Sequence, residues 1–346
     1  MSNLTGLDAE LVSIIQEAVP LVERPFAEIA SRVGTAEPEV IHRLTWLKRE
    51  ARVIRQISAV FDTRALGYRS ALVAAKYSPD AVDQAASVVG GHPGVSHNYR
   101  RDHAYNLWYT LAVPPNSRLG LDRTIERLHQ LSGAAVTRKM ETLRLFKIGV
   151  RLDVKGERSA DSRGAVAAYD EEDQEQARSY PLTEADIRAV RALQRDLPLT
   201  ETPFDVIAAQ GGFTTPELLA IARRLLERRQ MRRYAAVLRH REAGFSHNCM
   251  GVWNVPDDCV DEVGPAMARF DAVSHCYLRP RYEDWPYNVF TMVHGRTPQE
   301  CRAVLDAIAE TTGIRERDAL WSTKEYKKTR VSYFTPEIEQ WEARFG

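Results

Sequence analysis

The chain carries one sequence pattern twice, and this internal repeat constrains its fold more than any other feature. Residues 20–47, which begin P-L-V-E-R-P-F, align with residues 198–225, which begin P-L-T-E-T-P-F. The same separation of 178 positions relates the pairs Pro25 and Pro203, Pro38 and Pro216, and His97 and His275. Because the separation persists over most of each half, the 346 residues form a fused duplication.

A polar segment at residues 153–180 separates the two halves. It becomes acidic toward its end and has almost no apolar periodicity, which is typical of a flexible linker. Each half divides again into a helical part and a part of alternating strands and helices. The predicted domains are 1–62 (helical), 63–152 (strands and helices), 153–180 (linker), 181–239 (helical) and 240–346 (strands and helices).

The helical part of each half has the pattern of a winged helix-turn-helix. Apolar residues at helical spacing indicate three short helices, of which the second ends near Gly34 and the third begins at Pro38. The string V-I-R-Q-I-S-A-V-F at 53–61 then predicts a strand. In the second half, we expect the same elements at 183–196, 203–210, 215–229 and 231–238.

The other part of each half follows the β-α-β-β-α-β order of a ferredoxin-like domain. The elements predicted in the first half are a strand at 69–77, a helix at 80–90, strands at 94–100 and 106–113, a helix at 119–131 and a last strand at 135–151. The second half repeats this order over about 244–334. The fold class is therefore α+β, with two tandem copies of a winged helix-turn-helix followed by a ferredoxin-like domain.

Composition excludes several classes of protein. The formal net charge is zero, which argues against a dedicated nucleic-acid binder, because phosphate contacts favour a basic surface. No apolar run approaches the length of a membrane span, and the N-terminus has no apolar signal core. The four cysteines show no C-x-x-C spacing, so we expect reduced thiols, no metal site of the protein's own and a cytoplasmic location.

Two strings of unusual chemistry carry a resemblance to a known family. P-G-V-S-H-N-Y-R-R-D-H-A-Y-N-L-W-Y-T at 93–110 resembles one subunit type of the siroheme decarboxylases. The strings at 238–253 (L-R-H-R-E-A-G-F-S-H-N-C-M-G-V-W) and 273–295 (V-S-H-C-Y-L-R-P-R-Y-E-D-W-P-Y-N-V-F-T-M-V-H-G) resemble the other type. The domain order resembles the wider leucine-responsive regulator/AsnC family. A fused chain is similar to the enzyme of heme d1 biosynthesis, and separate subunits serve an alternative heme route.

The resemblance implies a lyase that removes carbon dioxide from two acetate side chains of siroheme to give didecarboxysiroheme. Such a substrate has eight carboxylates around a flat ring, so cations should hold its rim and aromatic side chains its faces. The expected substrate-binding residues are Arg100, Arg101, Tyr105, Trp108, Asn248, Trp253, Tyr277, Arg279, Arg281, Trp285 and Tyr287. For any single residue, a solvated arginine or a core aromatic is the competing interpretation.

Histidine is the expected general acid, because a proton must replace each departing carboxyl group. His97 and His275 occupy the same place in the repeat, and the full candidate set is His97, His103, His240, His247 and His275. One of them is a candidate axial ligand of the siroheme iron, and the sequence does not assign these two uses. No added cofactor is expected, since the tetrapyrrole is its own electron sink. His42, His92 and His129 lie outside the cluster and are expected on the surface.

Two other functions compete with decarboxylation. A DNA-binding regulator is the first, but Glu37 and Glu39 at the start of the first recognition helix would repel phosphate. A siroheme or heme sensor without catalysis is the second. We expect the two ferredoxin-like domains to pair face to face with the substrate between them, and the second half to hold the chief site. A homodimer and contacts with other enzymes of heme d1 biosynthesis stay open.

Overall fold

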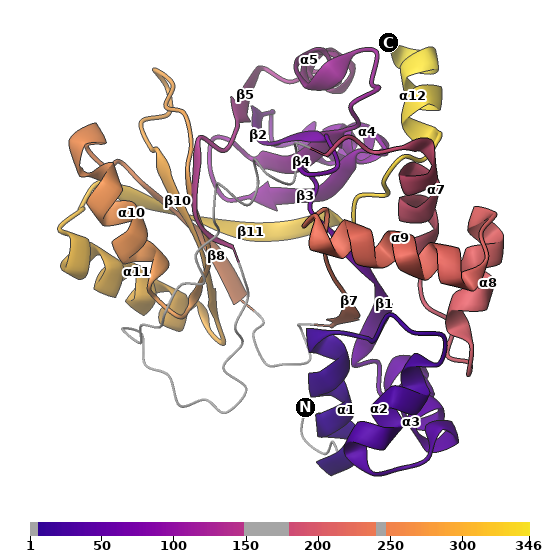
Figure 1. The fold of residues 1–346 in the computed structure, drawn as a ribbon. Coiled ribbons are helices and arrows are strands. Elements are labelled where there is room, and N and C mark those ends of the chain that lie inside the picture. Colours follow the sequence, from indigo (N-terminus) through magenta and orange to yellow (C-terminus); the bar gives the residue numbers. More distant parts are fainter. Residues whose placement is uncertain (1–5, 149–179, 240–246) are drawn as a thin grey trace. The chain divides into compact units, whose positions relative to one another are not determined.

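The computed structural model describes residues 6–148, 180–239 and 247–346 (Figure 1). All but the last residue of the predicted linker lies outside these ranges. The chain divides into two compact units that do not follow the order of the repeat. The first unit contains both helix-turn-helix copies, and the second contains both ferredoxin-like copies. No helix within the described ranges has the length and apolar character needed to cross a bilayer.

The first unit confirms the predicted helices and strands. The first copy consists of α1 (Gly6–Glu17), α2 (Pro25–Val33), α3 (Glu37–Arg49) and β1 (Ile54–Phe61). The second consists of α7 (Glu184–Leu193), α8 (Pro203–Gly211), α9 (Thr215–Glu227) and β7 (Met231–Leu238). A proline begins both α2 and α8, where its missing N–H costs no helical hydrogen bond. Gly34 and Gly212 end these helices at φ values of 69° and 71°, a left-handed conformation that favours glycine.

The two helix-turn-helix copies contact each other closely. Strands β1 and β7 pair with each other in an antiparallel two-stranded sheet. Lys48 of the first copy lies 2.7 Å from Asp196 of the second, and Arg24 lies 3.0 Å from Glu201. The prediction that Glu37 faces the phosphate side was wrong, because this carboxylate is buried and pairs with Arg24.

The second unit is built on one nine-stranded sheet in the order β5-β2-β4-β3-β11-β8-β10-β9-β6. The first copy contributes β2 (Arg69–Lys76), α4 (Val82–Gly90), β3 (Val95–Arg101), β4 (Leu107–Val113), α5 (Gly120–Ser132), β5 (Val136–Met140) and β6 (Arg144–Ile148). The second contributes β8 (His247–Trp253), η2 (Asp257–Cys259), α10 (Val260–Ala268), β9 (Val273–Leu278), β10 (Val289–Gly295), α11 (Pro298–Thr312), β11 (Arg317–Lys328) and α12 (Glu337–Phe345). The predicted β-α-β-β-α-β order is confirmed in both copies.

In each copy, the end of the last strand pairs with a strand of the other copy. The strand predicted at 135–151 is broken, so that β5 pairs with β2 of its own copy and β6 pairs with β9 of the second copy. Figure 1 shows β11 as one long strand; its first part pairs with β8 and its last part with β3 of the first copy. The predicted pairing of the two halves therefore includes an exchange of strand ends.

Equivalent lysines fix both exchanged ends. Lys147 donates to the carbonyl of Phe270, just after α10, at 2.8 Å. Lys327 donates to the carbonyl of Gly90, at the end of α4, also at 2.8 Å. A cation beside the last carbonyls of a helix is favourable, because the helix dipole concentrates negative charge there. The exchange is thus anchored in the same way in both copies.

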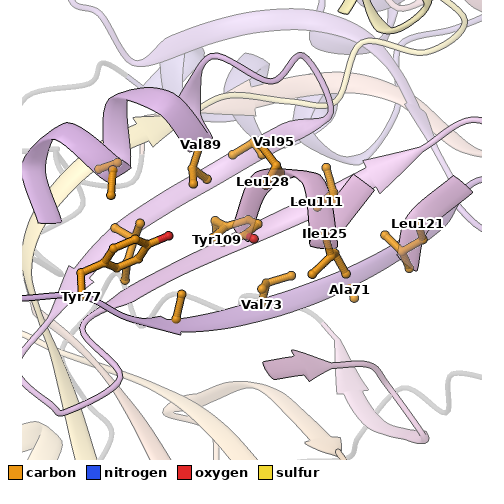
Figure 2. Close-up of a cluster of buried hydrophobic side chains, with 14 of the residues drawn as sticks. Ala71, Val73, Tyr77, Val89, Val95, Tyr109, Leu111, Leu121, Ile125 and Leu128 are labelled. Atoms are coloured by element: carbon orange, nitrogen blue, oxygen red, sulfur yellow. The ribbon is translucent and has the colours of Figure 1, made fainter. Parts of the chain in front are cut away.

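Apolar cores lie on both faces of the sheet. Figure 2 shows the core between the first copy's strands and helices, where Val73 and Tyr109 of the sheet meet Val89 of α4 and Leu128 of α5. The second copy has the equivalent core beneath α10 and α11. A third cluster joins the helix-free faces of the two copies, and Trp108 contacts Trp285 within it at 5.4 Å between ring centres. The predicted face-to-face contact of the two domains is therefore present.

Helix α12 was not predicted, and it packs against the first copy. The carboxylate of Glu342 accepts hydrogen bonds from Ser117 and from the backbone N–H of Arg118. Trp341 contacts His92 at 4.3 Å between ring centres. The prediction that His92 lies on the surface was wrong, because this side chain is fully buried and burial lowers its pKa to about 3.

Candidate active site

The repeated histidine strings form two equivalent triplets on the helix-free face of the sheet. Successive side chains of a strand point to opposite faces. On β3, Asn98 points toward the helices, because its amide donates to the carbonyl of Ala86 in α4. His97, Tyr99 and Arg101 therefore occupy the opposite face. On β9, Cys276 belongs to the helix-side core, so the same alternation places the second triplet on the helix-free face. The second triplet consists of His275, Tyr277 and Arg279.

Within each triplet the histidine stacks on the tyrosine. The ring centres are 6.2 Å apart for His97 and Tyr99, and 6.0 Å apart for His275 and Tyr277. The triplets also influence each other. Burial lowers the pKa of His275 to about 4, with smaller contributions from the charges of His294, Arg279, His97 and Lys147. His97 is among these contributions, so an electrostatic interaction extends from the first triplet to the second.

A serine holds each of these histidines by the same nitrogen. The Oγ atom of Ser96 is 3.0 Å from Nδ1 of His97, and the Oγ atom of Ser274 is 2.7 Å from Nδ1 of His275. With Nδ1 engaged, Nε2 is the ring nitrogen through which each imidazole can meet a ligand. Both histidines can therefore exchange a proton at Nε2 while the serine keeps the ring oriented.

Arg101 and Arg279 connect the triplets to the strand exchange. Both are buried, with 6% and 7% of their surface exposed. Arg101 donates to the carbonyl of Leu320 at 2.8 Å, and Arg279 donates to the carbonyl of Met140. Arg279 also lies over the ring of Tyr277, 4.6 Å from its centre. The guanidinium groups thus stabilise the point where each strand passes from one copy to the other. That they also bind substrate carboxylates stays a prediction.

Comparison with known proteins places this arrangement in a family. The model of the siroheme decarboxylase NirDL-like HTH domain matches residues 8–55 and 186–232, and the model of the AsnC-like ligand binding domain matches 65–147 and 242–327. A siroheme decarboxylase from Hydrogenobacter thermophilus is 38% identical over 335 residues, which cover 96% of each chain. The chain belongs to the siroheme decarboxylase family.

Two further members of the siroheme decarboxylase family bear on the site. The crystal structure of the siroheme decarboxylase NirDL in co-complex with an iron-uroporphyrin III analogue is similar at a TM-score of 0.77 and 33% identity, over 97% of both chains. A siroheme decarboxylase beta subunit from Methanosarcina barkeri is 43% identical over 150 residues, which are 43% of this chain and 99% of that subunit. The first of these relatives shares the fold of nearly the whole chain, and the second corresponds to a little under half of it.

The aromatic residues predicted to cover the substrate are mostly buried in this family member. Tyr105, Trp108 and Trp285 lie in the cluster between the helix-free faces and are at most 1% exposed. Tyr287 is half-buried beside Trp285. Trp253 lies on the helix side of the sheet, where its indole N–H donates to Thr291 at 3.0 Å. The structure therefore removes Trp253 from the predicted site, because the sheet separates it from both triplets.

Two of the predicted arginines lie away from the triplets. Arg100 points to the helix side, where its charge acts on the carboxyl of Asp83. Arg281 donates to Asn254 Oδ1 at 3.0 Å and to the carbonyl of Pro286 at 2.9 Å. Arg281 therefore shapes the connection between β9 and β10, and neither arginine shares the face of His97 and His275.

The remaining predicted residues are dispersed. His103 lies in the connection from β3 to β4; its Nδ1 accepts from the backbone N–H of Tyr105 at 2.9 Å, and burial lowers its pKa. His247 is exposed, with its Nδ1 2.9 Å from the carbonyl of Arg296. The Oδ1 atom of Asn248 is 3.4 Å from the Oγ atom of Ser322. His240 lies outside the described residues. Of the predicted histidines that the structure describes, only His97 and His275 occupy equivalent positions on the helix-free face.

Sequence reasoning missed two groups that the structure brings to the triplets. The Oγ atom of Ser274 is also 2.7 Å from Nε2 of His294 on β10. Lys147 on β6 also acts electrostatically on His275, although its amine donates to the carbonyl of Phe270 beside α10. The repeated V-S-H string was a signal for the serine, whereas His294 has no histidine at the 178-residue separation.

An acidic residue holds the long connection between β9 and β10 to the first copy. Asp284 accepts hydrogen bonds from Lys76 at 2.9 Å, from the hydroxyl of Tyr105 at 2.8 Å and from Arg138 at 3.1 Å. Burial acts to raise the pKa of Asp284, but these hydrogen bonds and the charge of Arg138 outweigh it and hold the pKa at about 2. The connection that carries Trp285 is thereby fixed over the aromatic cluster.

Proposed function

We propose that this chain is a siroheme decarboxylase that removes carbon dioxide from two acetate side chains and yields didecarboxysiroheme. The observation that carries the proposal is the pair of His-x-Tyr-x-Arg triplets on the helix-free face of one shared sheet, in a member of this family. A protein that is similar to this chain over nearly its whole length has been crystallised with an iron-uroporphyrin III analogue. A flat ligand of that class supports siroheme as the substrate.

The chemistry needs a proton donor more than a nucleophile. When an acetate loses carbon dioxide, the electron pair of the broken bond stays on the side-chain carbon and spreads into the tetrapyrrole. A proton then completes a methyl group. We propose that Nε2 of His275 or His97 delivers it, since a serine already holds Nδ1 of each ring. The substrate's carboxylates would raise the low pKa of His275 toward neutrality, because nearby negative charge favours the imidazolium.

The other components of the proposal follow from the same chemistry. The reaction needs no added cofactor, because the ring of the substrate accepts the electron pair. One of the two histidines is a candidate axial ligand for the siroheme iron. The proposal also includes a cytoplasmic location, a homodimer, and contacts with other enzymes of heme d1 biosynthesis or of an alternative heme route.

The regulator interpretation is not favoured, because the helix-turn-helix surfaces are engaged within the protein. Arg223 of the second copy donates to the carbonyl of Leu21 in the first copy at 2.7 Å. Arg224 pairs with the buried carboxylate of Asp186. Arginines committed to such contacts are less available to phosphate groups, so these domains are better explained as packing elements.

The test is anaerobic incubation of the whole chain with siroheme, followed by mass spectrometry of the tetrapyrrole. Two successive losses of carbon dioxide are expected. Replacing His275 or His97 by alanine should lower turnover about 10²–10⁴-fold at a working site, the usual share of general acid catalysis, while siroheme binding survives. Siroheme that binds but keeps its mass would support the sensor interpretation. Wild-type rates in both variants and in the double variant would remove the histidines from the mechanism.

A further inference from the structure

In the second copy, one serine hydroxyl connects two histidines. Ser274 is 3% exposed, and its Oγ atom is 2.7 Å from Nδ1 of His275 and 2.7 Å from Nε2 of His294. Both distances are those of well-formed hydrogen bonds. A hydroxyl can accept from one nitrogen while it donates to the other, so these three side chains form a continuous path for a proton.

The first copy lacks the second histidine of this path. Leu111 pairs with Val95 on the neighbouring strand just as Val293 pairs with Val273. The residue that follows Leu111 is Ala112, which therefore occupies the place of His294. Ser96 keeps its 3.0 Å contact with His97, but no imidazole stands behind it at that position. The two triplets thus have the same strand positions, but Ser274 contacts His294 whereas Ala112 occupies that place in the first copy.

The surroundings of His275 explain why such a path would be useful. Burial lowers the pKa of His275 to about 4, with smaller electrostatic contributions from His294 on β10, Arg279, His97 on β3 and Lys147 on β6. At neutral pH the unliganded side chain is therefore a neutral imidazole. A neutral imidazole gives up its Nε2 proton readily only when another proton reaches Nδ1 at the same time.

We propose that His294 supplies this proton through Ser274, so that His275 and His294 act as one donor in decarboxylation. This inference rests on the proposed function. Protonated His294 passes its Nε2 proton to the Oγ atom of Ser274, whose own proton moves to Nδ1 of His275. His275 releases its Nε2 proton to the side-chain carbon, which holds the electron pair left by carbon dioxide. The acetate becomes a methyl group, His294 becomes neutral and His275 ends as its other neutral tautomer.

The path assigns different roles to the two copies. When the product leaves, Nε2 of His275 takes a proton from solvent while its Nδ1 proton returns through Ser274 to His294, so the ring is reloaded without leaving its place against Tyr277. The serine beside His97 has Ala112 behind it in place of a histidine, which suits a histidine that binds or orients the substrate. His294 is thus a proton-relay residue for the second copy.

The experiment compares His294→Gln, His294→Ala and Ser274→Ala with the matched variant Ser96→Ala in the first copy. Single turnovers with siroheme are followed by mass spectrometry between pH 6 and 9, and siroheme affinity is measured by absorbance titration. We expect the three second-copy variants to lose about 10²-fold in rate at unchanged affinity, with an altered pH profile. Ser96→Ala should lower the rate less than these variants and keep the wild-type pH profile, because it removes the orientation of His97 but interrupts no proton path.

Two further readouts separate proton transfer from a structural role. Added imidazole should restore part of the rate to His294→Ala, because the vacated space admits a small proton donor. The double variant Ser274→Ala, His294→Gln should be no slower than either single variant, because both interrupt one path. A lower rate with an unchanged pH profile and no imidazole rescue would overturn the relay. Wild-type rates in His294→Ala and Ser274→Ala would also overturn it and leave the proposed function intact, whereas a wild-type chain that releases no carbon dioxide would refute that function itself.

Discussion

Replacing Gly264 of α10 by alanine tests the strand exchange, because this glycine faces a side chain that arrives from the other copy. A Cβ atom at position 264 would lie 2.4, 2.5 and 2.6 Å from three ring carbons of Phe146 on β6. Carbon atoms in contact are normally about 3.5–4.0 Å apart, so the ring or the strand would have to move by about 1 Å.

The size of the effect follows from two opposing contributions. Overpacking of this kind costs about 1–3 kcal/mol. Alanine has a higher helix propensity than glycine, which raises the free energy of unfolding by up to about 1 kcal/mol. We therefore expect a net loss of about 1–2 kcal/mol, which lowers the melting temperature of a unit of this size by about 2–8 °C.

The assay is thermal unfolding followed by circular dichroism, with Phe146→Leu as the partner substitution. A smaller side chain at position 146 should relieve the clash, so the double variant should be more stable than the sum of the single effects by about 1 kcal/mol. Ala86→Gly is the matched control, since Ala86 is the first-copy equivalent of Gly264; it should show the loss of helix propensity and of one buried methyl group, with no coupling to position 146. A Gly264→Ala variant as stable as the wild type, with no coupling to position 146, would refute the packing of β6 against α10.

Two further predictions concern the contacts that hold the copies together. Asp284→Asn should lower the melting temperature at pH 6, and the difference from the wild type should shrink as the pH falls from about 4 toward 2. The sign follows because the pKa of Asp284 is depressed to about 2, so its stabilising contribution is complete above the ordinary carboxyl pKa of 3.8 and is lost on protonation; a difference that is constant over this range would contradict the assignment. Arg279→Ala should cost about 1–3 kcal/mol of stability, because the buried carbonyl of Met140 loses a donor. Thermal unfolding checks this loss, and a variant that loses siroheme affinity at full stability would instead support the contact with a substrate carboxylate.

The repeat and the order of elements could be read from the sequence, because local signals determine them. Proline at the start and glycine at the end of α2 and α8 mark helices whatever surrounds them. One strand was predicted at 135–151, where the described residues form two, and the local pattern could not reveal that β5 and β6 have partners in different copies. Pairing partners depend on contacts between distant parts of the chain, which local periodicity does not encode.

The candidate site was predicted in part for the same reason. His97 and His275 were identified because the repeat marks them. Trp253 was predicted to bind substrate from its residue type alone, without its place in the strand: Cys249 and Trp253 share the helix side of β8. His294 was overlooked because it has no counterpart in the first copy, and only the pairing of β9 with β10 brings it to Ser274.

The exchanged strand ends make each copy an incomplete fold without the other. A first copy alone would leave the edge of β3 without β11, and a second copy alone would leave the edge of β9 without β6. Open edges of this kind invite association with other chains. Fusion into one polypeptide therefore fixes the ratio of the copies at one to one and ensures that each edge meets its intended partner during synthesis. Because strands and not the covalent connection hold the sheet together, the same architecture is equally compatible with two separately encoded chains, the form in which the Methanosarcina barkeri beta subunit is found.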